Sequence, residues 1–117
     1  MTCTRKPLVW IGTSHEDFVR FPAEVQDDFG YRLWRVENGE LPLHAKPLRG
    51  FGGAGVIELI QNFDGSTYRT VYTVRIRDRV FVLHCFQKKS SSGLKTSTQD
   101  LEAIKRRLML AEEMYGK

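Results

Sequence analysis

The sequence predicts an α+β domain in which an antiparallel sheet packs against two N-terminal helices and one C-terminal helix. Three observations predict this class. Apolar residues repeat at helical spacing near both ends of the chain, three strand-like segments follow one another between residues 56 and 87, and turn signals separate those segments. The consecutive hairpins favour a meander with the helices on one face. At 117 residues, the chain is expected to form a single domain over residues 1–117.

The first third of the chain predicts one strand and two helices. Residues 8–11 form a short apolar run, which is typical of a buried strand. Ser14 can cap a brief helix, and Pro22 marks the start of a longer one. Asn38 and Gly39 are a stop signal for that second helix. Its apolar positions follow helical spacing: Val25, Phe29, Leu33 and Val36.

The middle of the chain predicts a loop and then three strands. Residues 41–55 are rich in glycine and proline, and they match neither the P-loop nor the dinucleotide-binding fingerprint. Asp64-Gly65 is a hairpin signal between strands, and Asp78 marks a second tight turn of two or three residues. The predicted strands span residues 56–61, 67–76 and 80–87.

Alternation along the second of these strands assigns its side chains to two faces. Tyr68, Thr70, Tyr72, Val74 and Ile76 share one face, and Arg69, Val71, Thr73 and Arg75 share the other. Because the first set supplies the apolar surface, the fold is expected to tolerate the loss of Arg69. A final helix begins at Ser97-x-x-Asp100 or Thr96-x-x-Gln99, either of which resembles a capping box. That helix is expected to bury Leu101, Ile104, Leu108, Ala111 and Tyr115.

Charge is unevenly distributed along the chain. Residues 1–60 hold 7 Lys/Arg against 8 Asp/Glu, a net −1, whereas residues 61–117 hold 11 against 6, a net +5. A basic half attracts polyanions, although mild basicity is also common for solubility alone. Histidine and cysteine spacing predicts no metal site, and two cysteines predict no disulfide framework, which favours the cytoplasm. No membrane span or export signal is expected.

Several side chains are candidates for chemistry, and each has a structural alternative. Arg69 is expected opposite or diagonal to Lys88, with Lys89 close by, so that an anion between them would relieve their repulsion; alternatively they are solvated strand-edge cations. His84 could be a general base or acid, or a structural residue of an apolar strand. Tyr68 and Tyr72 could stack on bases or pack within the sheet. Cys85 is expected in the core, and the run 105–107 is expected on a mostly solvated helix face.

A set of sequence blocks gives these candidates a context. The blocks are Leu48-Arg49-Gly50, Val56-Ile57-Glu58-Leu59, Tyr68-Arg69-x-Val71-Tyr72, Leu83-His84-Cys85-Phe86-Gln87-Lys88-Lys89, Lys95-Thr96 and Ala103-Ile104-x-Arg106-Arg107. Together they resemble phage-derived Gp49-like, HigB-type toxins of the RelE/ParE superfamily. The resemblance implies a RelE-like fold across nearly the whole chain.

The resemblance also implies roles for individual residues. Arg69 matches an arginine that stabilises charge on the scissile phosphate, and Lys88 and Lys89 match basic residues at the end of the last strand. Glu58 stands where RelE itself offers a lysine pair, so the general base is left open between Glu58, His84 and a lysine. RNA contacts are also expected at Arg49, Tyr68, Tyr72 and Lys95.

The function expected from this resemblance is the toxin of a type II toxin–antitoxin pair that cleaves mRNA on the ribosome. Such an endoribonuclease uses the RNA 2′-hydroxyl as nucleophile and needs no metal or other cofactor. The expected partners are a helix-turn-helix antitoxin, in a hetero-oligomer, and ribosome-bound mRNA. The alternatives are a ParE-like inhibitor that binds DNA gyrase without catalysis and a non-toxic phage-derived binding module.

Overall fold

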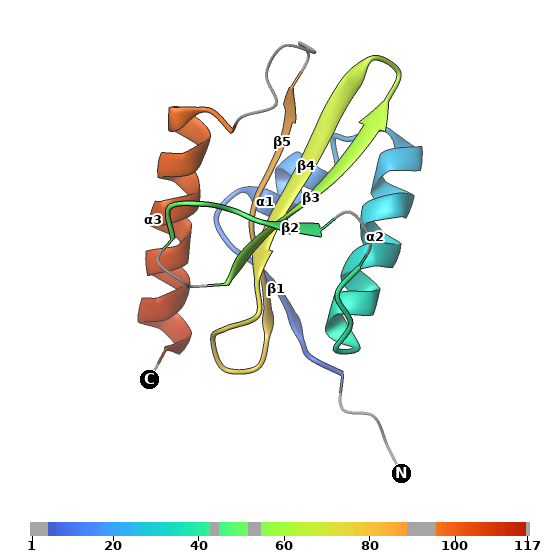
Figure 1. Ribbon diagram of the computed structural model, residues 1–117. Coiled ribbons are helices and arrows are strands. Elements are labelled where there is room, and N and C mark those ends of the chain that lie inside the picture. The colour runs from blue at the N-terminus through green and yellow to red at the C-terminus, as the bar shows by residue number, and fades with distance from the viewer. Residues whose placement is uncertain (1–4, 43–44, 52–54, 89–95, 117) are drawn as a thin grey trace.

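The computed structural model describes residues 5–42, 45–51, 55–88 and 96–116. The elements follow the predicted order of strand, two helices, three strands and helix, with one additional short strand (Figure 1). Their bounds are β1 Leu8–Trp10, α1 Ser14–Phe18, α2 Ala23–Glu37, β2 Ala45–Pro47, β3 Val56–Phe63, β4 Ser66–Thr73, β5 Val80–Lys88 and α3 Thr98–Tyr115.

The strands form one five-stranded sheet in the order β1-β5-β4-β3-β2. The β2–β3, β3–β4 and β4–β5 pairs are antiparallel, whereas β1 runs parallel to β5. This confirms the α+β class. The predicted meander accounts for β3 to β5 only. β2 lies inside the segment that was expected to be a loop, and pairing of β1 with the last strand is a long-range contact.

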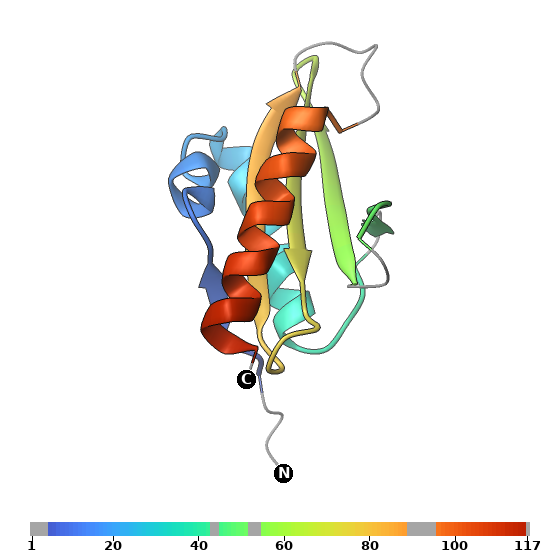
Figure 2. The same cartoon turned by 90° about the vertical axis from the view of Figure 1, so that its left-hand side faces the viewer.

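The helices cover both faces of the sheet, so the prediction that they share one face is wrong. α1 and α2 lie on one side and α3 lies on the other (Figures 1 and 2). The physical reason is that β4 and β5 are apolar on both faces. Tyr72 packs in the core beneath α2, and Val71, its neighbour in sequence, packs in the core beneath α3. A strand that is apolar on both faces must be covered twice to bury that surface.

The first predicted turn is confirmed and the second is longer than expected. Asp64 and Gly65 join β3 to β4 with φ values of 51° and 79°, the left-handed conformations that a two-residue hairpin needs. β4 then ends at Thr73 rather than at Ile76, and a six-residue connection, residues 74–79, leads to β5. Ile76 consequently lies in the core beneath α3, not on the face of Tyr72 as alternation predicted.

The predicted start of α3 is confirmed, whereas that of α1 differs. Ser97 is the N-cap of α3, and its hydroxyl accepts a hydrogen bond from the Asp100 amide at 3.1 Å. Ser14 was expected to be a cap, but it is the first residue of α1 after Thr13. Its buried hydroxyl instead donates to the Val82 carbonyl at 3.1 Å and joins α1 to β5.

Candidate functional site

Three of the predicted site residues lie on the face of the sheet that α3 covers. Glu58 and His84 are the cross-strand partners of Val71 on its two sides. Arg69 is two residues before Val71 and therefore points to the same face. Adjacent strands thus bring Glu58, Arg69 and His84 beneath the N-terminal half of α3.

Arg69 and Glu58 form a buried ion pair. Arg69 Nη1 donates to Glu58 Oε2 at 3.1 Å, and the two residues are only 1% and 3% exposed. The Thr96 hydroxyl donates to the same carboxylate oxygen at 3.0 Å and lies 3.4 Å from Arg69 Nη1, from which it accepts. Arg69 is therefore a buried residue and not a solvated strand-edge cation. Its negative partner is Glu58 from the neighbouring strand, and an external anion is not needed to explain its charge.

His84 is held at both ring nitrogens. Arg107 can only donate, so its 3.0 Å contact with Nδ1 requires this nitrogen to be an acceptor. Nε2 then carries the proton and donates to Asp100 Oδ1 at 2.8 Å. Burial lowers the pKa of His84, the hydrogen bond to Asp100 opposes this effect, and the Arg107 charge reinforces it. The lone pair of this neutral imidazole already accepts a hydrogen bond from Arg107. This arrangement fits a structural role for His84 better than the role of a general base.

Arg107 connects three parts of the molecule at this point. Its guanidinium also donates to the Leu83 carbonyl at 2.9 Å and to the Thr13 hydroxyl at 2.9 Å. The run 105–107 was expected on a mostly solvated face, which holds for Lys105 and Arg106, while Arg107 is half-buried. Sequence reasoning missed this role. A signal was present, because Asp100 and Arg107 are seven residues apart and therefore share one helix face.

Cations lie at the edge of this buried network. Lys88 pairs with Thr67, and Arg69 pairs with Phe86, so Lys88 is diagonal to Arg69 as one of the two expected registers predicts. Lys88 is half-buried, whereas Arg49 is exposed in the turn after β2. Lys89 and Lys95 fall outside the described residues.

Tyr68 and Tyr72 lie on the opposite face, in the core beneath α2. They are 6% and 2% exposed, and the Tyr68 ring packs edge-on against Phe21 with centroids 5.1 Å apart. Burial raises the pKa of Tyr72 to about 12. The idea that these rings stack on bases is therefore wrong for this structure, and the packing alternative holds. Cys85 is a core residue as expected, and burial raises the pKa of its thiol to about 12.

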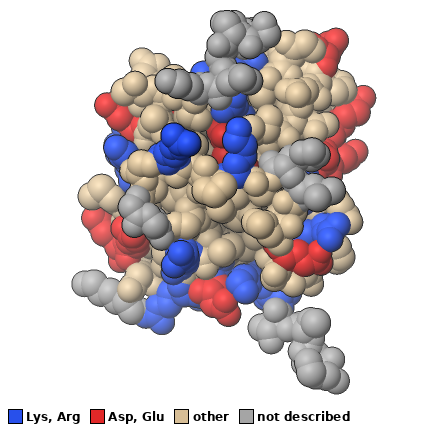
Figure 3. Space-filling view, in the orientation of Figure 1, with Lys and Arg blue, Asp and Glu red and all other residues tan. Residues whose placement is uncertain are grey.

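Among the described residues that face the viewer in Figure 3, Lys and Arg side chains form no single dense patch. In the view of Figure 3, Lys and Arg side chains stand at separate points around an uncharged central area, and Asp and Glu lie mostly toward the margins. Among the described residues, no group of three or more His, Cys, Asp or Glu side chains is placed to hold a metal ion. Within the same residues, no helix is long and apolar enough to cross a membrane.

The comparisons with known proteins first define the class of fold. The chain is similar to the solved structure of an E. coli toxin RelE double mutant in the free state, with a TM-score of 0.61 and 17% identity over 89% of this chain and 98% of that one. It is also similar to the RelBE2 toxin–antitoxin complex from Mycobacterium tuberculosis, with a TM-score of 0.49 and 20% identity over 76% of this chain and 98% of that one. The fold is thus that of RelE.

The sequence then defines the family. Residues 16–109 match the model of the phage-derived Gp49-like proteins (DUF891), and the chain belongs to this family. No curated protein matches the sequence significantly.

Proposed function

We propose that this protein is the toxin of a type II toxin–antitoxin pair and cleaves mRNA on the ribosome. The observation that supports this most is the combination of a Gp49-like sequence with the fold of a protein described as a toxin, RelE. The other proposed features follow from it: a helix-turn-helix antitoxin as partner in a hetero-oligomer, the HigB type, and a cytoplasmic site of action.

The proposed reaction uses the RNA 2′-hydroxyl as nucleophile and needs no metal ion or other cofactor. The protein then has to align this hydroxyl with the phosphate and stabilise the charge that develops. We assign phosphate contacts to Lys88 at the end of β5 and to Lys89, the next residue in the sequence, and further RNA contacts to Arg49 and Lys95. Lys88 and Arg49 are partly or fully accessible, as this role requires.

Glu58, Arg69 and His84 have a different part in this proposal. Their side chains are buried and bonded to one another or to α3, so we assign them to positioning. The Glu58–Arg69 pair holds Thr96, which is the residue before the α3 N-cap. His84 holds Asp100 in the first turn of the same helix. Together they fix the start of α3 beside the end of β5.

One observation favours the gyrase-binding alternative. The three residues that the sequence suggested for catalysis, Arg69, Glu58 and His84, are at most 9% exposed. A protein that only binds its target does not need them at the surface.

Induction of the protein in growing cells separates the two functions. Primer extension on translated mRNA is expected to show new cleavage ends within minutes, while plasmid supercoiling stays unchanged. The variant that tests the site is Lys88→Ala. It is expected to reduce cleavage and to leave the fold intact, because Lys88 is half-buried at a strand end. Loss of supercoiling with intact mRNA would establish the gyrase alternative instead. Normal growth with intact mRNA and normal supercoiling would favour the third possibility, a non-toxic binding module.

A further inference from the structure

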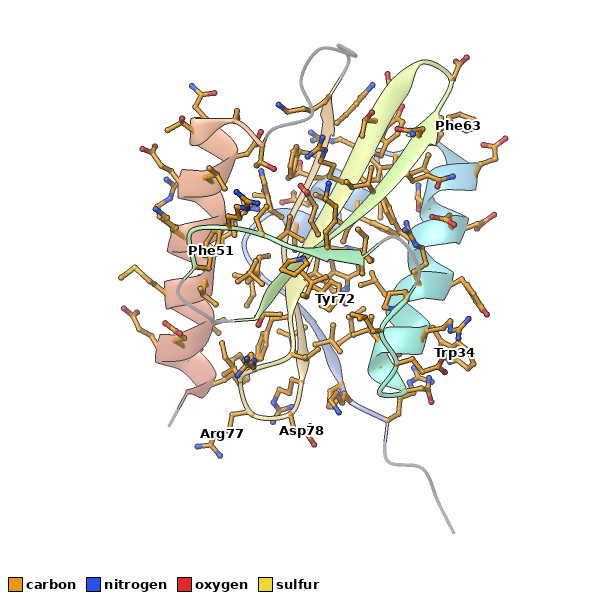
Figure 4. The ribbon with its side chains drawn as sticks, viewed as in Figure 1. Trp34, Phe51, Phe63, Tyr72, Arg77 and Asp78 are labelled. Carbon is orange, nitrogen blue, oxygen red and sulfur yellow. The ribbon has the colours of Figure 1, made fainter. Side chains whose placement is uncertain are left out.

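A hollow of about 380 Å³ lies on the other side of the molecule, between the C-terminal end of α2 and the sheet. Its volume is within the range of protein pockets that accept ligand groups, about 300–1,000 Å³. Apolar side chains form most of its lining: Val36, Leu41, Ile57, Tyr72 and Val74. Tyr72, which was expected to contact RNA, contributes to this wall (Figure 4).

Three charged residues stand around the hollow, and two of them are neutralised within the protein. Lys6 Nζ lies 3.1 Å from Asp78 Oδ1, and Glu40 is paired with Arg35. Arg75 is exposed and has no acidic partner among the described residues. The hollow therefore combines an apolar wall with one cation, Arg75, for which the described part of the chain offers no acidic counter-charge.

Gly55 allows Arg75 to lie along the rim of the hollow. A Cβ atom at Gly55 would be 2.5 Å from Arg75 Cγ and 2.7 Å from its Nε. The glycine also has a φ of +69°, which other residues rarely adopt. The position of the Arg75 side chain thus depends on a residue without a side chain.

Exposed apolar residues continue from this rim onto the outer face of α2. Leu41, at the rim, is 73% exposed. Arg35, which pairs with Glu40, donates to the Tyr31 hydroxyl at 3.2 Å, and the Tyr31 ring stacks on Trp34 with centroids 6.1 Å apart. Tyr31 and Trp34 are 56% and 48% exposed, and Trp34 points away from the sheet (Figure 4). Aromatic residues of this kind are enriched at protein–protein interfaces.

We propose that this α2 docking surface, formed by Tyr31, Trp34, Leu41, Arg75 and the hollow, binds a segment of the antitoxin. The segment inserts a large apolar side chain into the hollow and places a carboxylate on Arg75. This inference rests on the proposed function, because the partner is the antitoxin. It leaves the opposite face, where α3 and Lys88 lie, outside the contact.

The chemistry of the surface favours this occupant over RNA and over a second copy of the chain. RNA binding needs several cations along a phosphate backbone, whereas this rim offers one available cation beside an apolar wall. A second copy would bring another Arg75 and another net charge of +4 to the contact. An acidic, amphipathic segment complements both the charge and the apolar wall.

The test is a calorimetric titration of the protein with the purified product of the adjacent reading frame. Leu41→Asp and Arg75→Glu are each expected to weaken binding by at least about 10-fold, because each removes a central contact and opposes the partner's charge. The matched controls are Met114→Asp and Arg106→Glu on α3, which make the same kinds of change at exposed positions on the opposite side and are expected to leave the affinity unchanged. Hydrogen exchange in the complex should show protection at residues 36–42.

Each other outcome of the titration overturns the inference in an identifiable way. Full affinity in both α2-side variants, or loss of affinity in the α3 variants alone, would place the partner elsewhere and leave the proposed function standing. If the wild-type protein does not bind, the product of the adjacent reading frame is not its partner. The mRNA cleavage assay does not depend on this partner, so it decides the proposed function separately.

Discussion

The two faces of the sheet are built on different principles. Beneath α2 the contact is mainly apolar, with Val25, Phe29 and Leu33 packed on Tyr68 and Tyr72, and Arg32 adds one hydrogen bond to the Ile60 carbonyl at 3.0 Å. Beneath the first turns of α3, the sheet presents the Glu58–Arg69 ion pair and His84. The helix side chains Asp100 and Arg107 form hydrogen bonds with this histidine. An apolar core holds a helix without fixing its position finely, whereas a buried polar network holds it only in the geometry that satisfies every member.

The difference between the faces also concerns their energetics. A buried ion pair contributes little net stability, because desolvation offsets most of the attraction, yet removing one partner is very costly. Apolar packing loses stability more gradually as atoms are removed. The face beneath α3 is therefore expected to be the more sensitive to single changes and to pH.

The largest effect is expected for Arg69→Ala. This change leaves the Glu58 carboxylate buried without its partner, a loss of about 3–5 kcal/mol in the free energy of unfolding. Urea denaturation followed by circular dichroism measures the loss. A change below about 1 kcal/mol would show that the buried pair has no structural importance.

A double variant separates the structural role of this pair from any role in toxicity. Glu58→Leu with Arg69→Met replaces the pair by apolar groups and is expected to recover most of the stability. If the refolded double variant is again toxic, the charge of Arg69 is not used in the reaction. If it is stable and inactive, the reaction depends on this pair, either through the charge of Arg69 or through the bonds that hold Thr96.

On the apolar face, Leu33→Ala is expected to cost about 2–5 kcal/mol, because it removes a 2% exposed side chain and leaves a cavity. This loss should be the same at pH 5 and pH 8, because Leu33 carries no titratable group. Parallel urea titrations at the two pH values measure it. A clear pH dependence of the difference from wild type would contradict the division between the faces.

His84 should make the α3 face sensitive to acid. Its pKa is lowered in the folded protein, whereas in the unfolded chain it is about 6.5. Between these two values the unfolded chain binds more protons, so stability is full above about pH 6.5 and falls as the pH decreases through that interval. His84→Gln should remove this component from the pH profile of urea unfolding. An identical slope in wild type and variant between pH 7 and pH 5 would exclude it.

Sequence patterns predicted those features that depend on neighbouring residues. The Asp64-Gly65 hairpin and the Ser97 cap were predicted because a few consecutive residues determine them. The parallel pairing of β1 with β5 joins residues such as Leu8 and Val80, and no local pattern specifies it.

The burial of the site residues also depends on contacts between residues that are far apart in the sequence. Alternation correctly placed Arg69 and Val71 on one face, but it could not show that α3 covers that face. A register shift between Val71 and Tyr72 in the β4–β5 pairing also sets His84 opposite Val71, which fixed alternation does not anticipate. The charge of Arg69 therefore indicated a surface site, although its partner is the equally buried Glu58.

The smallest expected effect concerns how α3 begins. α2 starts after Pro22 without a side-chain cap. Ser97, in contrast, caps α3 and also donates to Asp100 Oδ2 at 2.7 Å. Ser97→Ala should cost about 1 kcal/mol, the usual value of an N-cap. Because Asp100 also holds His84, the variant should in addition increase amide exchange in the first turn of α3. A stability loss without faster exchange there would mean that the polar network positions the helix even without its cap.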